Sequence, residues 1–349
     1  MYKPRFTITP EINNRIAEIE RIRAQVERTS ILPEVEIHLR FRATVESVHS
    51  STSIEGNPLN VLQVQDVLQG KIVRAPDYAV IEVLNYKNAL DWISAQQSKT
   101  LTTETVLSLH QFMMKDLLPS EKVGHFRPGP IYVVNEENES ESIEYIGPEA
   151  REVPRLVENL CKWMDLEQQK ILHPVLRAGL FHYLFVSVHP FSDGNGRTTR
   201  LFTEHLLQVW NYGFKNTLSL DSYYLQHQLE YYEALNRSRT FDGRMDADIT
   251  PFLDFFTTGF LESVQTLQQY VEIGGFEMGK APIRLNTEEL SILDYAHQFG
   301  AVALSDVIDM LNIPRRTAQR RLQTLVSKGI IEKFDQGPAV RYRILIRNK

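Results

Sequence analysis

The sequence predicts a mostly α-helical protein with one β-hairpin and a small C-terminal domain, and three observations support this prediction. Apolar residues recur at helical spacing through most of residues 10–273. Within that range, strand-like alternation of apolar and polar residues is convincing only at 130–146. Around residues 273–284, glycines and a proline indicate a linker, and the chain beyond it becomes basic.

Composition limits the classes of function to be considered. The 349 residues suffice for two or three domains, and 42% hydrophobic residues suffice for a buried core. A net charge of -6 excludes a general attraction to nucleic acid, so any such contact must be local. One cysteine, Cys161, excludes an intrachain disulfide and fits a core position. Since the N-terminal residues are not apolar and no run of about 18 apolar residues occurs, we expect a cytoplasmic protein without a membrane partner.

The predicted helices follow one another along the chain. Residues 10–30 place isoleucines at helical spacing among Glu and Arg, which is typical of an amphipathic helix. A second helix is expected at 34–53, because a Gly-Asn-Pro run soon follows it. These two helices make up an N-terminal segment, 1–60, ahead of a core domain, 61–272. Further helices are expected at 61–70, 78–96, 103–118, 151–167, 173–188, 196–210, 225–238 and 249–273.

Residues 130–146 are the predicted β-hairpin. The first strand contains Ile131, Tyr132, Val133 and Val134, and the second strand follows an acidic tip. An exposed hairpin edge can pair with an extended segment of another protein through main-chain hydrogen bonds. We therefore expect either a flap that docks a partner protein or an ordinary surface hairpin.

Residues 189–200, HPFSDGNGRTTR, join two predicted helices and contain most of the candidate site. Pro190 disfavours helical geometry at His189, so the apolar helix before it should end there. The next helix begins near Arg197, and the loop before it contains two glycines, Gly194 and Gly196. Backbone N–H groups at a helix N-terminus lack partners and attract anions, and glycine lets a phosphate approach closely.

The polar side chains of this segment add the groups that nucleotide chemistry needs. Arg197 and Arg200 lie three residues apart, so they share a helix face and can bind phosphate oxygens. Asp193 offers a hard oxygen ligand to a phosphate-bound Mg²⁺. His189, at the other end of the loop, can act as a base on a hydroxyl. A solvated turn would explain any one of these residues, but the whole set predicts a phosphate site.

The twelve residues match, at every fixed position, the signature of the Fic family: HPF, any residue, Asp or Glu, GNGR, any two residues, Arg. The helices with one hairpin over roughly residues 30–270 also resemble the family's all-α Fic fold with its small β-hairpin flap. The resemblance implies a protein adenylyltransferase that moves AMP from ATP to a Ser, Thr or Tyr hydroxyl of a protein, itself included, and releases pyrophosphate. Doc-type kinases carry a Lys and an altered loop where this chain has Gly196, so the intact loop favours AMP transfer.

The resemblance also implies a role for each residue of the motif. His189 would deprotonate the target hydroxyl, Asp193 would hold Mg²⁺, and Phe191 would be structural within the nucleotide site. The phosphates would be bound by Gly194, Asn195, Gly196, Arg197 and Arg200. Paired tyrosines border the nucleotide in a similar region of the family, which makes Tyr231 and Tyr232 candidates for the adenine pocket. Core aromatics at helical spacing are the alternative for these two.

Residues 51–57, STSIEGN, resemble the family's inhibitory motif. Ser51, Glu55 and Gly56 match its pattern of Ser or Thr, any three residues, Glu, then Gly or Asn. The resemblance implies that Glu55 pairs with Arg200 and occupies the place of the γ-phosphate. The alternative is a simple helix C-terminus.

The C-terminal residues 285–349 resemble a winged helix-turn-helix domain. Three short predicted helices precede a strand–turn–strand segment, and residues 311–349 contain ten Lys or Arg against two acidic residues. Arg315, Arg316 and Arg320 begin the third helix, where a recognition helix would meet DNA. Docking of another protein is the equal alternative for this domain.

Other functions stay open at this point. The loop fits transfer of a different nucleotide or of phosphocholine, and it also fits removal of AMP with Glu55 positioning water. The alternative from another class of function is a DNA-binding regulator with a self-modifying Fic domain. A homodimer is one of the assemblies that the sequence permits.

Overall fold

The computed structural model describes residues 2–96, 101–137, 140–166, 171–276, 285–336 and 339–345. The chain forms two compact units, one of residues 1–23 and 42–264, the other of residues 24–41 and 265–349. The predicted boundaries at residues 60 and 272 stay predictions, and the division into the two units falls inside three long helices. A helix keeps its apolar periodicity where its packing partners change, so periodicity could not locate this division. Most of the predicted linker, 277–284, lies outside the described residues.

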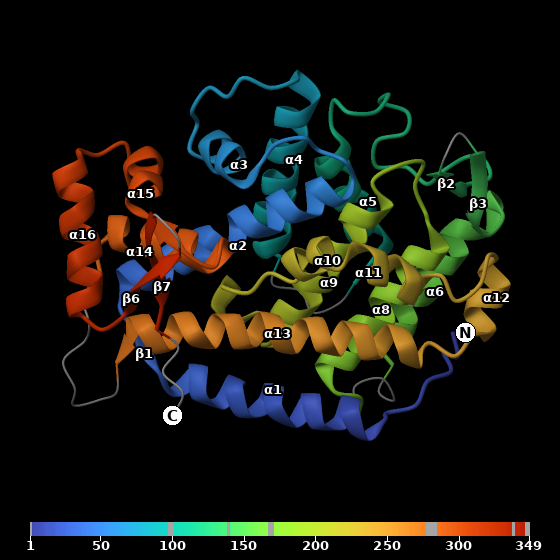
Figure 1. The fold of residues 1–349 in the computed structure, drawn as a ribbon. Coiled ribbons are helices and arrows are strands. Elements are labelled where there is room, and N and C mark those ends of the chain that lie inside the picture. The colour runs from blue at the N-terminus through green and yellow to red at the C-terminus, as the bar shows by residue number, and fades with distance from the viewer. Residues whose placement is uncertain are drawn as a thin grey trace. The chain divides into compact units, whose positions relative to one another are not determined.

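The first unit is almost entirely helical (Figure 1). All of the helices predicted from periodicity are present, although the one expected at 225–238 is two short helices, and α12 was not expected. None of the described helices is both long and apolar enough to cross a bilayer. The bounds are α3 Val61–Leu68, α4 Asp77–Ser94, α5 Thr103–Met114, α6 Val153–Met164, α8 Pro174–Val188, α9 Asn195–Val209, α10 Asp221–Gln226, α11 Gln228–Leu235 and α12 Phe241–Asp246. Three more helices continue from one unit into the other, α1 Pro10–Arg28, α2 Pro33–Ile54 and α13 Thr250–Gly274.

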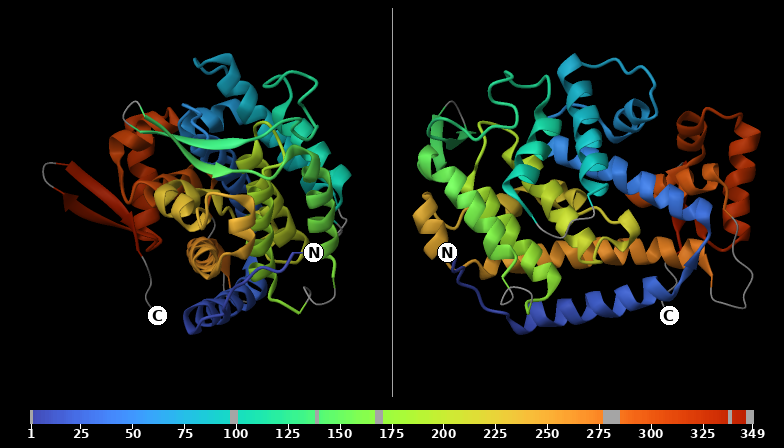
Figure 2. Two further views of the ribbon diagram at one scale, coloured as in Figure 1. Left: turned by 90° about the vertical axis from the view of Figure 1, so that its right-hand side faces the viewer. Right: turned by 180° about the vertical axis from the view of Figure 1, so that it is seen from behind.

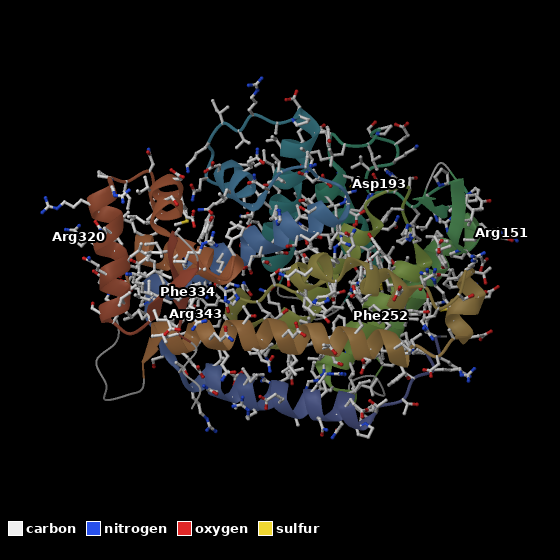
Figure 3. The ribbon with its side chains drawn as sticks, viewed as in Figure 1. Arg151, Asp193, Phe252, Arg320, Phe334 and Arg343 are labelled. Carbon is white, nitrogen blue, oxygen red and sulfur yellow. The ribbon has the colours of Figure 1, made fainter. Side chains whose placement is uncertain are left out.

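Helix α8 forms the centre of this unit, because every one of its residues from Val175 to Val188 is buried. It packs against α9, α6 and α12. Gly179 lets α13 approach closely, since a Cβ there would lie 2.9 Å from Leu253 Cδ2. Phe252 of α13, labelled in Figure 3, adds a ring contact with Tyr183 at 5.5 Å. A helix packed on all sides fixes the position of the loop at its C-terminal end.

The predicted hairpin is confirmed as strands β2 Tyr132–Glu137 and β3 Ser140–Ile146, which pair antiparallel (Figure 2). The register shifts between Val133 and Val134, and the side chain of Val134 lies outside the described residues. Tyr132 and Val133 are exposed. Tyr145 of β3 is buried, and its hydroxyl donates a hydrogen bond to the Ser187 carbonyl of α8. The second strand therefore attaches the hairpin to the core.

The second unit contains the three predicted C-terminal helices and the predicted strand–turn–strand. Strand β7 is central in an antiparallel sheet of order β5-β7-β6, and the short β5 was not expected. The two-residue strands β1 and β4 form a separate antiparallel pair. Arg343 of β7 lies over the ring of Phe334 of β6, and both are labelled in Figure 3. The bounds are α14 Thr287–Gln298, α15 Leu304–Leu311, α16 Arg315–Ser327, β1 Ser30–Ile31, β4 Gly275–Phe276, β5 Val302–Ala303, β6 Ile331–Gln336 and β7 Ala339–Ile344.

Candidate active site

The loop between α8 and α9 begins with a residue in the left-handed region. His189 has φ 49° and ψ 61°, directly before Pro190, so α8 ends where the proline predicted. Phe191 is fully buried and stacks on His110 with ring centroids 3.8 Å apart. Its role is therefore structural. Gly194 has φ 76° and ends the loop, and α9 begins at Asn195.

The side chain of Asn195 is fully engaged inside this loop. Its Oδ1 accepts from the Phe191 N–H and its Nδ2 donates to the Phe191 carbonyl, both at 2.9 Å. Asn195 was expected to bind phosphate with its neighbours, but this pairing leaves its backbone N–H as the group that can do so. A Cβ at Gly194 would lie 2.6 Å from Met114 Sδ. Glycine is needed there for packing as well as for conformation.

His189 is a neutral imidazole with one nitrogen available. Its Nδ1 lies 3.1 Å from the Val186 carbonyl, which can only accept, so Nδ1 carries the proton and Nε2 has the free lone pair. Burial lowers the pKa of His189 to about 4, although the bond to Val186 opposes this shift. The charges of Arg244 and Arg127 lower the pKa further. The arrangement provides a base at Nε2.

Arg127 holds the motif loop in place and was not expected from the sequence. Its Nε donates to the His189 carbonyl at 2.8 Å, and its backbone N–H donates to the Pro190 carbonyl at 3.0 Å. Its guanidinium also donates to the carbonyls of Gly129 and Pro148, at the foot of the hairpin. The side chain therefore fixes the loop and the hairpin to each other.

Arg200 is 1% exposed, and it makes the contacts that the inhibitory motif predicts. Its Nε donates to Ser51 Oγ at 2.8 Å, and its Nη2 donates to Glu55 Oε1 at 2.7 Å and to the Ser51 carbonyl at 2.9 Å. Glu55 follows the last residue of α2, and its side chain is 28% exposed. Burial alone would raise the pKa of Glu55, but Arg200 and Arg197 hold it below its usual value, so the carboxylate is charged.

The Glu55 carboxylate also lies against the first turn of α9. A Cβ at Gly196 would come 2.3 Å from Glu55 Oε1 and 2.9 Å from Arg200 Nη1. The missing side chain at Gly196 is what lets the carboxylate approach. The same turn is the N-terminus of α9, so the Glu55 carboxylate lies where backbone N–H groups favour an anion.

A second carboxylate, Asp221, lies beside Arg200 in the core and was missed by the sequence reasoning. Its Oδ1 is 3.8 Å from Arg200 Nε, and its Oδ2 accepts from Ser47 Oγ at 3.0 Å and Tyr86 OH at 2.9 Å. Ser47 also lies 3.1 Å from Glu204 Oε2. Burial raises the pKa of Glu204 well above its usual value. Ser47 has one proton to donate, so a protonated Glu204 donating to Ser47 satisfies the group, with Asp221 as the charged partner of Arg200.

Arg197 also has a carboxylate partner outside the motif. Its Nη1 donates to Oε1 of Glu82 in α4, and both side chains are buried. Its Nη2 donates to Asp193 Oδ1 at 3.0 Å. The sequence reasoning missed Glu82. The available signal was its place on the apolar face of α4, between Ala79 and Tyr86.

Asp193 is the candidate metal ligand. Its side chain, labelled in Figure 3, is 53% exposed. The hydrogen bonds that it accepts from the Gly194 N–H and from Arg197 both go to its Oδ1. Within the described ranges, no three His, Cys, Asp or Glu side chains gather so that they could hold a metal ion by themselves. One hard carboxylate oxygen beside an anion site fits Mg²⁺, which takes its other ligands from phosphates and water.

The two candidate tyrosines have different environments. Tyr231 is buried, and its hydroxyl lies 2.8 Å from His182 Nε2 inside the core. This position fits the alternative of a core aromatic, and a place for Tyr231 beside adenine stays a prediction. Tyr232 is 45% exposed and lies within 3.5 Å of Gln228, whose amide donates to the Ile54 carbonyl at the end of α2. Successive helical residues point about 100° apart, so only one of the pair could face the core.

The arginines of α16 are on its exposed side. Ala318, Leu322 and Leu325 form the buried face of this helix. Arg320 lies on the outer face (Figure 3), as do the other two candidates for DNA contact, Arg315 and Arg316.

Residues 100–207 match the model of the family described as the Fic/DOC family. The chain is 30% identical over 220 residues to the protein adenylyltransferase Fic of Culex quinquefasciatus, covering 61% of this chain and 39% of that protein. It is 26% identical over 219 residues to the protein of the same name from Nematostella vectensis, covering 61% and 46%. The chain therefore spans about two fifths of the length of the curated relatives it matches.

Solved structures share the fold. A Fic family protein from Desulfovibrio desulfuricans G20 superposes with a TM-score of 0.66 at 24% identity, over 100% of both chains. Fic-1 from C. elegans gives a TM-score of 0.58 at 21% identity, over 74% of this chain and 72% of that one. The fold is thus the mostly helical Fic fold with small antiparallel sheets.

Proposed function

We propose that this protein is an adenylyltransferase that transfers AMP from ATP to a hydroxyl group of a protein, and that Glu55 restrains it. The observation that carries the proposal is the Glu55 carboxylate on Arg200, against Gly196 and at the N-terminal turn of α9. An anion site occupied by the protein's own carboxylate, at the end of a loop that begins with a neutral histidine, fits a restrained nucleotide enzyme. The relatives named protein adenylyltransferase Fic support AMP as the transferred group.

In the proposed reaction, His189 Nε2 accepts the proton of the target hydroxyl. The hydroxyl oxygen forms a bond to the α-phosphorus while the bond from that phosphorus to the bridging oxygen breaks. Pyrophosphate leaves with the electron pair. The N–H groups of the first turn of α9, with Arg197 and Arg200, stabilise the charge that develops on the leaving group. Mg²⁺ held by Asp193 would neutralise part of the phosphate charge.

The restraint follows from competition for one place. Arg200 donates to Glu55 with the same Nη2 that would otherwise reach a phosphate oxygen. A charged carboxylate near Gly196 also repels phosphate. ATP must therefore displace Glu55 or bind in a pose that does not present its α-phosphorus to His189. Loss of a charged hydrogen bond of this kind corresponds to about tenfold or more in an equilibrium.

The hairpin is the proposed docking site for the target segment. Tyr132 and Val133 of β2 have exposed side chains, whereas β3 is attached to the core through Tyr145. A segment that pairs with β2 would extend the two-stranded sheet by main-chain hydrogen bonds. Arg127 would then keep the docked segment and His189 at a fixed separation.

The test uses ATP labelled at either the α- or the γ-phosphate with Mg²⁺. We expect α-label on protein, about tenfold more with Glu55→Gly than with the unaltered chain, and none with His189→Ala. Glu46→Gln is the matched control, because Glu46 is on the same helix and pairs with Arg42 instead. Label on protein from the γ-position alone would replace this proposal with a kinase. Equal labelling of the Glu55→Gly and Glu46→Gln chains would contradict the proposal that Glu55 restrains the enzyme.

A second function is proposed for the C-terminal residues, namely DNA binding by a winged helix-turn-helix domain. It is supported by the exposed positions of Arg315, Arg316 and Arg320 at the start of α16. Exposed cations of this kind bind phosphates in a salt-dependent manner. The full chain should bind a DNA duplex with an affinity that falls steeply with salt, measured by fluorescence anisotropy. Binding that is absent at low salt would favour protein docking for this domain.

A further inference from the structure

The geometry around Arg197 points to a positioning residue outside the motif and outside the inhibitory segment. Glu82 of α4 accepts from Arg197 Nη1, and both side chains are buried. We propose that Glu82 holds the Arg197 guanidinium in the orientation that the β- and γ-phosphates of ATP require. This inference rests on the proposed function, because it assumes that Arg197 meets those phosphates.

Glu82 is itself fixed from its other side. Its Oε2 accepts from Asn57 Nδ2 at 2.7 Å, and the same amide donates to the Ala79 carbonyl at 3.1 Å. Asn57 Oδ1 accepts from the Leu59 N–H at 3.0 Å. Both oxygens of Glu82 and both ends of the Asn57 amide are thus engaged. The carboxylate has the rigid support that is expected of an anchor.

The guanidinium retains donors for a ligand while it is anchored. An arginine has five N–H donors, and Glu82 and Asp193 account for one each at Nη1 and Nη2. Arg197 Nε is buried and has no hydrogen-bond partner among the described residues. Burial raises the pKa of the Glu82 carboxyl, and the charge of Arg197 opposes that shift. Anchoring on one edge leaves the guanidinium able to meet phosphate oxygens with the rest of its donors.

Comparison with Arg200 separates an anchor from a competitor. Arg200 also has a fixed, fully buried carboxylate neighbour, Asp221, which Ser47 and Tyr86 hold in place. It has in addition Glu55, which is partly exposed in the turn after α2. Glu82 resembles Asp221 in burial and support and differs from Glu55 in both. Its role is therefore to position an arginine, whereas Glu55 occupies one.

The experiment compares ligands with and without β- and γ-phosphates, in the Glu55→Gly chain. The ligands are AMP and an ATP analogue with a methylene group between the α- and β-phosphates, and binding is measured by calorimetry. Glu82→Gln should weaken binding of the analogue by about tenfold and leave AMP within about twofold. With α-labelled ATP, the same variant should raise KM for ATP more than it lowers kcat. Asp91→Asn is the matched control, because Asp91 lies on the same helix and pairs with Lys87 at the surface.

A second variant keeps the inference testable if Glu82→Gln does not fold. Asn57→Ala removes the hydrogen bond that supports Glu82 and leaves Arg197 unaltered. It should also weaken binding of the analogue, by a smaller factor than Glu82→Gln does. Tighter binding of the analogue in either variant would make Glu82 a competitor of phosphate and overturn the inference. Equal weakening of AMP would overturn it as well, since that outcome indicates a general structural role. The calorimetric binding measurements need no turnover, so they stand apart from a failure of AMP transfer itself.

Discussion

Helices α9 and α16 both have arginines in their first two turns, and the surroundings of these arginines are opposite. Arg197 and Arg200 of α9 are buried against carboxylates from the turn after α2, from α4 and from α10. The arginines in the first turns of α16 are exposed. A buried guanidinium with fixed partners presents one arrangement of donors, whereas an exposed one contributes a charge that salt screens. Burial and partners therefore decide what an arginine can recognise.

Acid should affect the surroundings of α9 most strongly, because three buried histidines and the half-buried His189 lie on or near that helix. Burial lowers the pKa of His110, His189 and His205 to about 4 and that of His182 to about 3. The unfolded chain binds these protons near pH 6.5, so stability is complete above that pH and is lost as pH falls toward 4, by roughly 2 kcal/mol per histidine at pH 5. Glu204, whose pKa burial raises, acts in the opposite direction.

Urea unfolding at pH 7 and pH 5 measures this effect, and a unit that is equally stable at both would contradict it.

Among single substitutions of the arginines of α9 and α16, we expect Arg200→Ala to lower the free energy of unfolding most. It leaves Asp221 in the core without its cation, and removal of one partner of a buried ion pair costs about 3–5 kcal/mol. The free energy of unfolding from urea titration measures the loss. Arg151→Ala, which breaks an exposed pair with Glu149, is the control and should stay within about 0.5 kcal/mol. If Arg200→Ala lowers the free energy of unfolding as little as the control does, the pair of Arg200 with Asp221 does not stabilise the fold.

Gly196→Ala sharpens the account of the α9 turn. Its Cβ would clash with Glu55 Oε1, and overpacking of this kind costs about 1–3 kcal/mol. In a chain that already carries Glu55→Gly the nearest atom is absent, so the same substitution should cost less. A double-mutant cycle on unfolding free energies measures the difference. Equal costs in both chains would mean that Glu55 does not lie at Gly196 in solution.

Arg320→Ala should have the smallest effect. The side chain is exposed, so the free energy of unfolding should change by less than about 0.5 kcal/mol. Loss of one phosphate contact should reduce the slope of log affinity against log salt for DNA by about 1. Fluorescence anisotropy across a salt series measures this slope, with Gln323→Ala on the same helix as the uncharged control. An unchanged slope would argue against contact between Arg320 and DNA.

The contiguous parts of the site could be predicted, because one short segment determines them. The stop at Pro190, the glycines of the loop and the arginine spacing were all readable in residues 189–200. The pairing of Glu55 with Arg200 required a family resemblance as well, since 145 positions separate the two residues. Helices were predictable from periodicity, and the boundary between the two units was not.

The supporting residues could not be predicted, because each comes from a different segment. Glu82 and Asp221 look like ordinary helical acids until folding buries them beside Arg197 and Arg200. Arg127 is one basic residue in a loop, and its three carbonyl partners are known only from the fold. A single sequence records apolar faces well, but it does not record which buried charge meets which.

The absence of a side chain at Gly196 has a genetic consequence. One space at this position receives the Glu55 carboxylate in this structure and would receive phosphate in the proposed reaction. A larger residue would therefore exclude the restraint and the nucleotide together. A selection for overactive variants should recover changes in residues 51–57 and few at Gly196. Escape from restraint and loss of catalysis would then map to separate segments of the gene.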